Sequence, residues 1–371
     1  MIYLDCAATS LQKPHAVSEA AARAIRELSS PGRGGYRSAM EAADVLLTCR
    51  MELSELFHVS EPERVIFTSS ATHGLNTAIK SLVEPGDKVV VSGYEHNAVM
   101  RPLRGIGAQV TIASSPLFRP EAAVEAFRRK LPGAKAAVVC HVSNVFGYIL
   151  PVEKIAALCA KEGVPLIVDA SQSAGCVRLD FDRLGCAFAA MPGHKGLLGP
   201  QGTGVLLCGD TVVKPLMEGG TGSDSARTEM PPYLPDRLEA GTHNMPGIAG
   251  LLAGVRWVRD RMPESILTHE RNMRAAVTEL IQYRDGLEAF TADDPAVQTG
   301  VLSVRLKNMD CEDAAGRLFE KGIAVRAGLH CAPLAHRTAG TMESGTVRLS
   351  FSPFTTRCEV IQAALALAEL R

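Results

Sequence analysis

The chain has 371 residues, of which 46% are hydrophobic and 21% charged, and its net charge at pH 7 is −1. This composition is typical of a globular protein with a sizeable core, and the length suits two domains. The balanced charge gives no general attraction to nucleic acid or to an anionic membrane. No apolar run approaches the roughly 18 residues of a membrane span, and the first residues, MIYLDCAATSLQKP, are unlike a secretory signal.

The ten cysteines are scattered, with no CxxC pair and no zinc-type spacing to histidine. Most lie in apolar segments, such as Cys140 in AAVVC and Cys208 in GVLLC, and are expected to be small buried side chains. So many thiols favour a reducing cytoplasm, and no metal site is expected.

Helical and extended patterns alternate over the first two thirds of the chain. We expect helices at 16–28, 39–57, 74–82, 121–130 and 152–161, and strands at 65–68, 89–92, 110–113, 136–140, 165–169 and 204–208. This alternation predicts a mostly parallel sheet with helices on both faces. Further helices are expected at 246–261, 267–283, 311–321 and 357–370, with strands at 301–305, 323–326 and 346–351, which indicates a smaller α+β domain.

Ligands of open α/β sheets collect at the carboxyl ends of the strands, and two unusual segments follow such ends. FTSSATHGLN, at 67–76, opens a helix whose backbone N–H groups suit a phosphate, although a simple N-cap would also explain it. Asp169, in PLIVDASQSAG, ends an apolar strand. A buried carboxylate needs a partner, such as a protonated pyridine nitrogen, unless it only caps the next turn.

Two further segments carry a lysine and a histidine near strand ends. Lys195, in MPGHKGLLGPQGTG, is surrounded by glycines and apolar residues, so desolvation would favour a nucleophilic amine; a solvated loop lysine is the alternative. His96, in GYEHNAVMRP, is placed to stack on a flat ligand, or else is an ordinary surface histidine.

The C-terminal part contains a candidate thiol and a candidate arginine. Cys331, in VRAGLHCAP, lies in a polar loop near His330 and Arg326, where cationic groups would make a thiol reactive; an inert cysteine is the alternative. Arg348, in TVRLSF, is an arginine on an apolar strand. It requires an anionic partner, and a substrate carboxylate would serve.

Taken together, these segments resemble the class V aminotransferase family of fold-type I pyridoxal-phosphate enzymes, and within it the cysteine desulfurase and selenocysteine lyase branch. The resemblance covers nearly the whole chain, through YLDCAATS, FTSSATHGLN, YEHNAV, HVSNVFG, DASQSAG, GHKGLLGPQGTG, LEAGTHN, VRAGLHCAP and VRLSF. It implies a large cofactor-binding domain, 15–262, with a mostly parallel seven-stranded sheet between helices. A small α+β domain would combine 1–14 with 263–371.

The resemblance also implies roles for single residues. Lys195 would be the Schiff-base lysine of pyridoxal phosphate, with Asp169 at the ring nitrogen and His96 stacked on the ring. Further cofactor contacts are expected from Ala71, Thr72, Asn144, Gln172, His194 and, across a homodimer, Thr242. Substrate contacts are expected from Arg348, Asn144 and Arg326. Lys195, Cys331 and His96 form the expected catalytic set.

The implied reaction converts L-cysteine to L-alanine and transfers sulfur to Cys331 as a persulfide, with a sulfur-acceptor protein as a further partner. Selenocysteine lyase, another class V aminotransferase or β-lyase, and a non-catalytic protein of the same fold remain as alternatives. Three residues depart from the family pattern: Cys6 stands at a usual Asn or Ser, Pro192 at a frequent hydroxyl residue, and Tyr36 at a common histidine.

Overall fold

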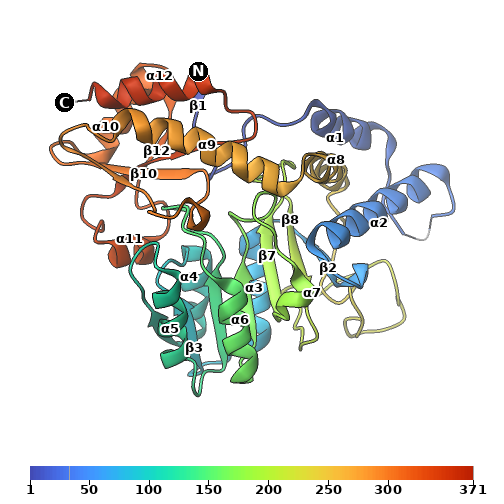
Figure 1. Ribbon diagram of the computed structural model, residues 1–371. Helices are drawn as coiled ribbons and strands as arrows, with labels where there is room; N and C mark the ends of the chain where they lie inside the picture. The colour runs from blue at the N-terminus through green and yellow to red at the C-terminus, as the bar shows by residue number, and fades with distance from the viewer. Residues whose placement is uncertain (33, 371) are drawn as a thin grey trace.

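The computed structural model describes residues 1–32 and 34–370, and its larger part is built on a seven-stranded sheet (Figure 1). In spatial order the strands are β2 (Val65–Thr68), β8 (Gly204–Cys208), β7 (Phe188–Pro192), β6 (Leu166–Asp169), β5 (Ala136–Cys140), β3 (Lys88–Ser92) and β4 (Gln109–Ala113). β8 runs antiparallel to its neighbours β2 and β7, and the other neighbouring pairs are parallel. The predicted mostly parallel sheet is confirmed.

Six of these strands coincide with the predicted apolar runs, and β7 is the addition. Its sequence, FAAMP, contains no β-branched residue, so local propensity provides little strand signal. The segment nevertheless pairs with β6 on one side and β8 on the other, and all five of its residues are buried. A central place in the sheet therefore outweighs the local preference.

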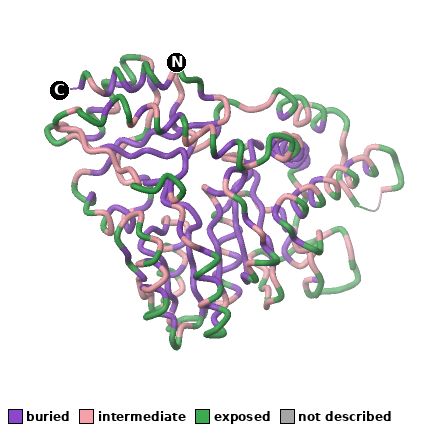
Figure 2. The backbone as a smooth tube through the Cα atoms, in the orientation of Figure 1, coloured by how far each residue is buried: buried purple, intermediate pink, exposed green. Residues whose placement is uncertain are grey.

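Helices cover the large sheet, and its inner strands are buried on both faces, whereas the edge strand β4 is only partly buried. The helices that follow its strands are α3 (Ala71–Leu82), α4 (Asn97–Ile106), α5 (Pro120–Lys130), α6 (Val152–Lys161) and the short α7 (Phe181–Leu184). Along β5, Ala136 and Val138 join one hydrophobic cluster, whereas Ala137 and Val139 join another. This alternation is expected for a strand with both faces covered. Figure 2 shows the buried backbone concentrated in these strands.

Four long helices complete the frame of the larger part and lead out of it. They are α1 (His15–Glu27), α2 (Arg37–Phe57), α8 (Met245–Arg261) and α9 (Pro263–Ile281), with a 3₁₀ turn, η1 (Pro62–Arg64), before β2. α1 and α2 both pack against α8. α9 begins four residues before the predicted start because Pro263 suits the first turn of a helix, where its missing N–H is not needed.

The smaller part combines an antiparallel sheet with three helices. Its strands in spatial order are β12 (Arg326–Gly328), β13 (Thr346–Ser350), β10 (Val301–Leu306) and β9 (Leu287–Phe290). Its helices are α10 (Cys311–Glu320), α11 (Pro333–Ala339) and α12 (Arg357–Ala368), and it also contains a 3₁₀ turn, η2 (Pro295–Val297). Leu302, Val304, Val347 and Leu349 contribute to a separate hydrophobic cluster here. The predicted smaller α+β unit thus has its own sheet and core.

The N-terminal segment joins this smaller part (Figure 1). β1 (Ile2–Tyr3) pairs in parallel with β11 (Ile323–Ala324), and Asp5 forms a bridge with Ser350. The single strand expected at 323–326 is wrong: it is divided, because β11 pairs with β1 whereas β12 pairs with β13. The domain limits, 15–262 against 1–14 and 263–371, stay a prediction.

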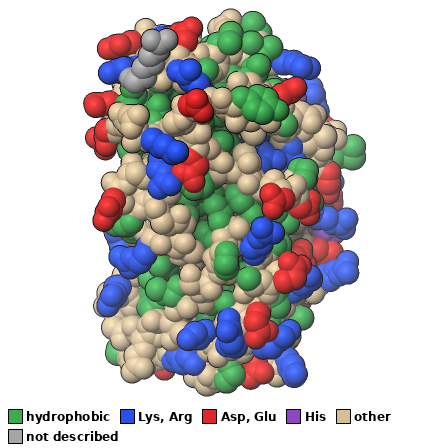
Figure 3. Space-filling view, turned by 60° about the vertical axis from the view of Figure 1, so that its left-hand side comes forward, with side chains coloured by type: hydrophobic (Ala, Val, Ile, Leu, Met, Phe, Trp, Pro, Cys, Tyr) green, Lys and Arg blue, Asp and Glu red, His purple; other side chains and the backbone are tan. Residues whose placement is uncertain are grey.

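Two surface properties bear on the excluded functions. Among residues 1–32 and 34–370, no helix combines the length and apolar character needed to cross a bilayer. On the face shown in Figure 3, acidic and basic side chains are interspersed without an extended patch of one sign. This face therefore offers no basic surface for nucleic acid.

Candidate active site

The predicted cofactor residues meet at one edge of the large sheet. β2, β3, β5, β6 and β7 all end at this edge, since β8 is the strand of this sheet that runs the other way. A cavity of about 110 Å³ lies there. Eight of the nine predicted cofactor residues line it: Ala71, Thr72, His96, Asn144, Asp169, Gln172, His194 and Lys195. We call this the Lys195 cavity.

Lys195 lies just beyond β7 in a tightly packed glycine-rich turn. Its carbonyl oxygen accepts a hydrogen bond from the Leu198 N–H at 2.9 Å. A Cβ atom on the next residue, Gly196, would lie 2.3 Å from the carbonyl oxygen of Ala174, so only glycine fits there. Desolvation lowers the pKa of Lys195 to about 8, although Asp169 opposes this shift. The amine therefore reaches its neutral, nucleophilic form near neutral pH.

Asp169 closes β6 with 4% of its surface exposed. Its Oδ1 accepts a hydrogen bond from the Ser171 N–H at 2.9 Å, so the turn-capping role considered for it is real. In the described part of the chain, no hydrogen bond or ion pair involves its Oδ2. A buried carboxylate in this state favours a cationic ligand atom beside it. A protonated pyridine nitrogen has the required charge and hydrogen.

The start of α3 offers backbone N–H groups to the same cavity. Ser70 is the N-cap, and its Oγ accepts a hydrogen bond from the His73 N–H at 3.2 Å. The N–H groups of Ala71 and Thr72 belong to the first turn, which has no earlier helical carbonyl to bind. The Thr72 side chain is exposed. The segment is thus both a capped helix start and a suitable place for a phosphate.

Two histidines line the cavity in defined orientations. His96 is the N-cap of α4, and its Nδ1 accepts a hydrogen bond from the Ala98 N–H at 3.0 Å. The neutral ring then carries its proton on Nε2. His194 Nδ1 lies 3.0 Å from the Thr9 Oγ1. Desolvation lowers the pKa of His96, and it lowers the pKa of His194 to about 4, so His194 is neutral at pH 7.

Two amide side chains connect the cavity with other segments. Asn144 donates from Nδ2 to the carbonyl oxygen of His330 at 2.8 Å, and Gln172 donates from Nε2 to the carbonyl oxygen of Ala7 at 2.9 Å. Each amide is therefore oriented by a backbone group of a distant segment. The first bond ties the cavity to the loop that carries Cys331, and the second ties it to the N-terminal segment.

Arg348 is buried on β13, and its anionic partner is a residue of this chain. Its Nη2 donates to Asp5 Oδ1 at 2.8 Å, and its Nη1 donates to the carbonyl oxygen of Asn144 at 2.9 Å. Arg326 donates from Nε to the other oxygen of Asp5 at 3.0 Å. Two guanidinium groups thus share one carboxylate, and the buried Nε of Arg348 has no hydrogen-bond partner. The group retains both positive charge and donors for an anionic ligand.

Cys331 is exposed in a strained loop beside the cavity. His330 and Cys331 have φ values of 49° and 54°, in the left-handed region that side chains seldom adopt. The Cys331 carbonyl oxygen accepts a hydrogen bond from the Asn97 N–H at 2.8 Å, and Asn97 directly follows His96. This bond holds the thiol-bearing loop against the start of α4, next to a residue that lines the cavity.

The expected cationic neighbour of Cys331 needs a correction. His330 is buried, and its Nε2 lies 3.0 Å from the Thr346 Oγ1. Desolvation, with a further contribution from Arg348, lowers the pKa of His330 to about 2. The ring is therefore neutral and supplies no positive charge to the thiol. Arg326 remains a cation, but its Nε is bonded to Asp5.

Thr242 is the predicted cofactor residue that lies outside the Lys195 cavity. It is exposed and lines a different cavity, together with Ser69 and His73 of the α3 start. Within one chain it is therefore close to the helix that begins at the Lys195 cavity but does not line that cavity. This position leaves its predicted role across a dimer as a proposal.

The three departures from the family pattern occupy different surroundings. Pro192 ends β7 and lines the Lys195 cavity, whereas Tyr36 is exposed before α2. Cys6 lines a smaller neighbouring cavity that also includes Lys195 and Glu270. Desolvation raises the pKa of Cys6 to about 12, so its thiol stays protonated.

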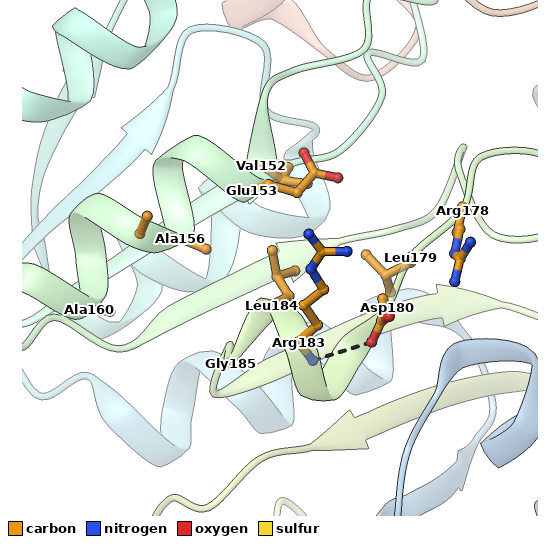
Figure 4. A pocket seen from close by; sticks show the side chains of 11 residues that line it. Val152, Glu153, Ala156, Ala160, Arg178, Leu179, Asp180, Arg183, Leu184 and Gly185 are labelled. Atoms are coloured by element: carbon orange, nitrogen blue, oxygen red, sulfur yellow. Dashed lines mark hydrogen bonds between the residues drawn. The ribbon is translucent and has the colours of Figure 1, made fainter.

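A larger cavity, of about 670 Å³, lies between α6 and α7 (Figure 4). Ala156 and Ala160 of α6 line one side, and Arg178 and Arg183 are among its polar side chains. It includes none of the predicted cofactor, substrate or catalytic residues. Size alone therefore does not identify the site, whereas the convergence of titratable groups around Lys195 does.

Two acidic residues of the site were not among the predicted ones. Asp5 orients Arg348 and Arg326, and Glu95 lies buried beside His96. Both belong to segments that the sequence already marks as unusual, YLDCAATS and YEHNAV. The sequence signal that could have identified Asp5 and Glu95 is an acidic residue within an otherwise apolar or small-residue segment.

Comparison with known proteins identifies the family. The model of the aminotransferase class-V family matches residues 2–362. The chain belongs to this family. A relative in Methanothermobacter thermautotrophicus, named a probable cysteine desulfurase, is 33% identical over all of this chain and 94% of its own length. The cysteine desulfurase CsdA of Escherichia coli is 28% identical, over 97% of this chain and 91% of its own.

Solved structures of cysteine desulfurases confirm the fold. The apo cysteine desulfurase of Thermococcus onnurineus superposes with a TM-score of 0.92 at 29% identity, covering 99% of this chain and 94% of that one. The Escherichia coli CsdA structure gives 0.87 at 27% identity, covering 98% and 93%. The class-V family implies pyridoxal phosphate. The unpaired Asp169 Oδ2, the free first turn of α3 and the lowered pKa of Lys195 fit its ring nitrogen, phosphate and aldehyde.

Proposed function

We propose that this chain is a pyridoxal-phosphate-dependent cysteine desulfurase that transfers the sulfur of L-cysteine to Cys331 and releases L-alanine. The observation that carries the proposal is the position of Cys331, exposed and hydrogen-bonded through its carbonyl to Asn97, next to His96. The names of the class-V relatives support the same activity.

Eight residues of the Lys195 cavity would hold the cofactor. Lys195 would attach it covalently, Asp169 would pair with its ring nitrogen, and His96 would stack on the ring. The first turn of α3 at Ala71 and Thr72, with His194, would bind the phosphate, while Asn144 and Gln172 would approach the ring hydroxyl. Bound pyridoxal phosphate serves as an electron sink that makes the substrate Cα–H acidic.

The two arginines that share Asp5 would bind the substrate carboxylate. Arg348 has an unused buried Nε, and Arg326 is about half exposed, so both keep donors for a ligand. Two guanidinium groups and one carboxylate leave one positive charge in excess. A substrate carboxylate would neutralise it. Asn144 would add a contact, because its carbonyl already binds Arg348 at 2.9 Å.

The chemistry needs a base and a nucleophile, and this chain provides both. Lys195, as a neutral amine, would take the proton from Cα of bound cysteine and return it to the carbon skeleton. The Cys331 thiolate would attack the substrate sulfur, forming an S–S bond while the Cβ–S bond breaks. The electron pair of that bond goes to Cβ, which gains a proton. The products are alanine and a persulfide on Cys331.

A homodimer is part of the proposal. Thr242 is exposed and lies outside the cavity of its own chain, as expected for a residue that completes a neighbouring site. Along α2, Met40, Leu47 and Met51 expose apolar side chains, which is typical of a surface covered by another subunit. The exposed Cys331 would similarly be accessible to a sulfur-acceptor protein.

The cytoplasm is the proposed location. All ten cysteines are free, and seven of them are buried. The thiols of a protein in a reducing compartment remain in this state.

The decisive experiment compares two exposed cysteines, Cys331 and Cys358. Cys331→Ala should lose alanine formation from L-cysteine while keeping the absorbance of bound cofactor, and Cys358→Ala should match the parent. Lys195→Ala should lose both activity and the cofactor's covalent attachment. Unchanged alanine formation by Cys331→Ala would refute the persulfide role.

Selenocysteine provides a second arm of the same experiment. Selenium is the better leaving group, so a selenocysteine lyase would release it without help from Cys331. If Cys331→Ala retains activity with selenocysteine but not with cysteine, both substrates are accepted by the same site. If the parent acts on selenocysteine alone, the desulfurase proposal is wrong.

Other reactions of the same fold are separated by their products. A solved structure of a cystine C–S lyase shares the fold at 21% identity with a TM-score of 0.85, so the fold alone does not select the reaction. A β-lyase or aminotransferase would yield a keto acid rather than alanine. A non-catalytic protein would yield neither product.

A further inference from the structure

Glu95 is a buried acid that the proposed mechanism does not use. It lies between β3 and α4, directly before His96, and its exposure is 0%. Its Oε1 accepts two hydrogen bonds, from the Ser92 hydroxyl and from the Cys140 N–H, the latter at 2.8 Å. Its Oε2 is buried without a hydrogen-bond partner.

The bond to Cys140 places Glu95 beside Asp169. Cys140 ends β5 and is the register partner of Asp169, which ends β6. Glu95 therefore bonds the backbone of the residue that is paired with Asp169, the Asp169 charge acts on it, and both acids are shielded from water. Two carboxylates this close in a low-dielectric interior do not both ionise without a cation for each.

The groups around Glu95 offer it no such cation. Its described partners are Ser92 and Cys140, and the ion pairs found between residues 1–32 and 34–370 do not include it. The titratable groups that interact with it are Asp169 on β6 and the Cys140 thiol on β5. Burial raises the pKa of the Cys140 thiol, so this group is neutral too.

We propose that Glu95 is an uncharged carboxylic acid and acts as a positioning residue that holds His96 in place. The negative charge in the Lys195 cavity then stays on Asp169. In this role the hydrogen bonds of Glu95 join the end of β3 to the end of β5. Because His96 is the next residue in the chain, these bonds also restrict the position of its backbone. The inference rests on the proposed function only in that the ligand against His96 and Asp169 is taken to be pyridoxal phosphate.

Two physical effects favour the uncharged form of Glu95. Desolvation raises the pKa of Glu95 to about 8, with the Asp169 charge contributing, so the acid form dominates at neutral pH. An ionised Glu95 would also place a second buried negative charge near Asp169, and the two like charges would repel each other. The ionised form would carry one oxygen buried without donor or countercharge, at a cost of several kcal/mol.

The first test is infrared difference spectroscopy of the holoenzyme at pH 7, comparing the parent with Glu95→Gln. The parent should show the carbonyl stretch of a protonated carboxylic acid, and the variant should lack it. Glu270, whose pKa burial also raises to about 8, contributes equally to both proteins and cancels. If the difference spectrum contains a carboxylate band and no acid band, Glu95 is ionised and the inference is wrong.

The second test is a pH titration of the absorbance of bound cofactor. Gln has the shape and charge of the acid form, so below about pH 8, where Glu95 keeps its proton, the absorbance of Glu95→Gln should follow that of the parent. If Glu95 were ionised in the parent, removing its charge would lower the midpoint by about half a pH unit or more. That shift would overturn the inference.

The positioning role is tested by a third variant, Glu95→Leu, which keeps the volume but loses both hydrogen bonds. It should bind cofactor about tenfold more weakly, whereas Glu95→Gln stays within about threefold of the parent. Equal binding by Glu95→Leu would remove the positioning role. Should Glu95→Leu fail to fold, the Glu95→Gln comparisons still decide the inference.

These outcomes are independent of the proposed function. A protein that binds the cofactor but forms no alanine from cysteine would refute the desulfurase proposal and leave the titration interpretable. A protein that binds no cofactor would refute the proposed function, whereas the infrared test would still report the charge of Glu95 in the protein as purified.

Discussion

Arg348 and Asp5 form a buried ion pair, with 2.8 Å between Nη2 and Oδ1, that joins the N-terminal segment to β13. Their exposed side-chain fractions are 2% and 11%. The pair therefore links residues at opposite ends of the chain and sets the orientation of the guanidinium group proposed to bind substrate.

Replacement of Asp5 by Asn should weaken both the fold and substrate binding. Removing one partner of a buried pair leaves an uncompensated charge, so the free energy of unfolding should fall by about 3–5 kcal/mol. The KM for cysteine should change with it, since Arg348 and Arg326 lose their shared acceptor. Urea unfolding and steady-state kinetics measure the two effects.

The exposed pair of Arg23 and Glu27 is the matched control, with 2.9 Å between Nε and Oε2. Glu27→Gln should cost less than about 1 kcal/mol, because solvent screens a surface pair. Equal losses for Asp5→Asn and Glu27→Gln would contradict the structural role given to Asp5.

The Lys195 amine should react in a pH range far below that of a free lysine. Desolvation lowers its pKa to about 8, so the neutral fraction in apoprotein rises as pH increases through about 8. Acetylation of Lys195, followed by mass spectrometry, should therefore show a midpoint there, with the exposed Lys161 as reference. A midpoint near that of Lys161 would show that the cavity does not desolvate the amine.

The sign of the Asp169 contribution gives a separate prediction. Asp169 raises the pKa of Lys195 by favouring the ammonium form, in opposition to desolvation. Asp169→Asn should therefore move the acetylation midpoint of Lys195 to lower pH. An upward shift would mean that the two groups do not interact as described.

A methyl group at Gly196 should displace Lys195. The added Cβ would meet the Ala174 carbonyl oxygen at 2.3 Å, and neither backbone segment can yield without moving the turn. Gly196→Ala should cost about 1–3 kcal/mol of stability and weaken cofactor binding. Gly105→Ala is the control: its Cβ would meet nothing within 4 Å, and in helix α4 it should stabilise by up to about 1 kcal/mol. Parent-like cofactor binding by Gly196→Ala would contradict this account.

Glu239 should anchor the segment that carries Thr242. Its carboxylate accepts hydrogen bonds from Arg50 at 2.9 and 2.8 Å and from the Phe67 N–H at 2.6 Å, and it pairs with His243 at 2.8 Å. Glu239→Gln should lower the free energy of unfolding by about 3–5 kcal/mol. If the dimer is completed through Thr242, cofactor affinity should fall as well.

The pH dependence of this effect has a defined sign. Desolvation would raise the pKa of Glu239, but the bonds from His243 and Arg50 outweigh it, and the net shift is downward. The stability due to the ionised group is present above the pKa of the unfolded chain and lost as pH falls through the lower folded value. The difference in the free energy of unfolding between the parent and Glu239→Gln should therefore become smaller as the pH falls. Urea unfolding at several pH values measures this difference. A difference that becomes larger in acid would contradict the role given to the ionised Glu239.

Strand β7 shows where local patterns stop being informative. Strands rich in Val and Ile can be predicted from their composition, whereas the segment FAAMP cannot. It forms a strand because β6 and β8 provide hydrogen-bonding partners on both of its sides. The same limit applies to 323–326, which is divided because two different partners compete for adjacent residues.

The site divides in a similar way. Lys195, Asp169 and His96 follow predictable strands, and carboxyl ends of such strands share one edge, so their convergence was foreseeable. The partner of Arg348 was not: Asp5 lies 343 residues away, and only the pairing of β1 with β11 and the bridge from Asp5 to Ser350 bring it there.

The sequence alone determines the order of the main elements, the family, and the candidate catalytic and binding residues. These can be read from the sequence because hydrophobic periodicity and the order of motifs are local properties. The tertiary structure decides which charges meet. Burial, protonation and pairing depend on segments far apart in the chain, as with Asp5 at Arg348, His330 held neutral, and Glu95 placed beside Asp169. These are long-range packing outcomes, and no window of neighbouring residues encodes them.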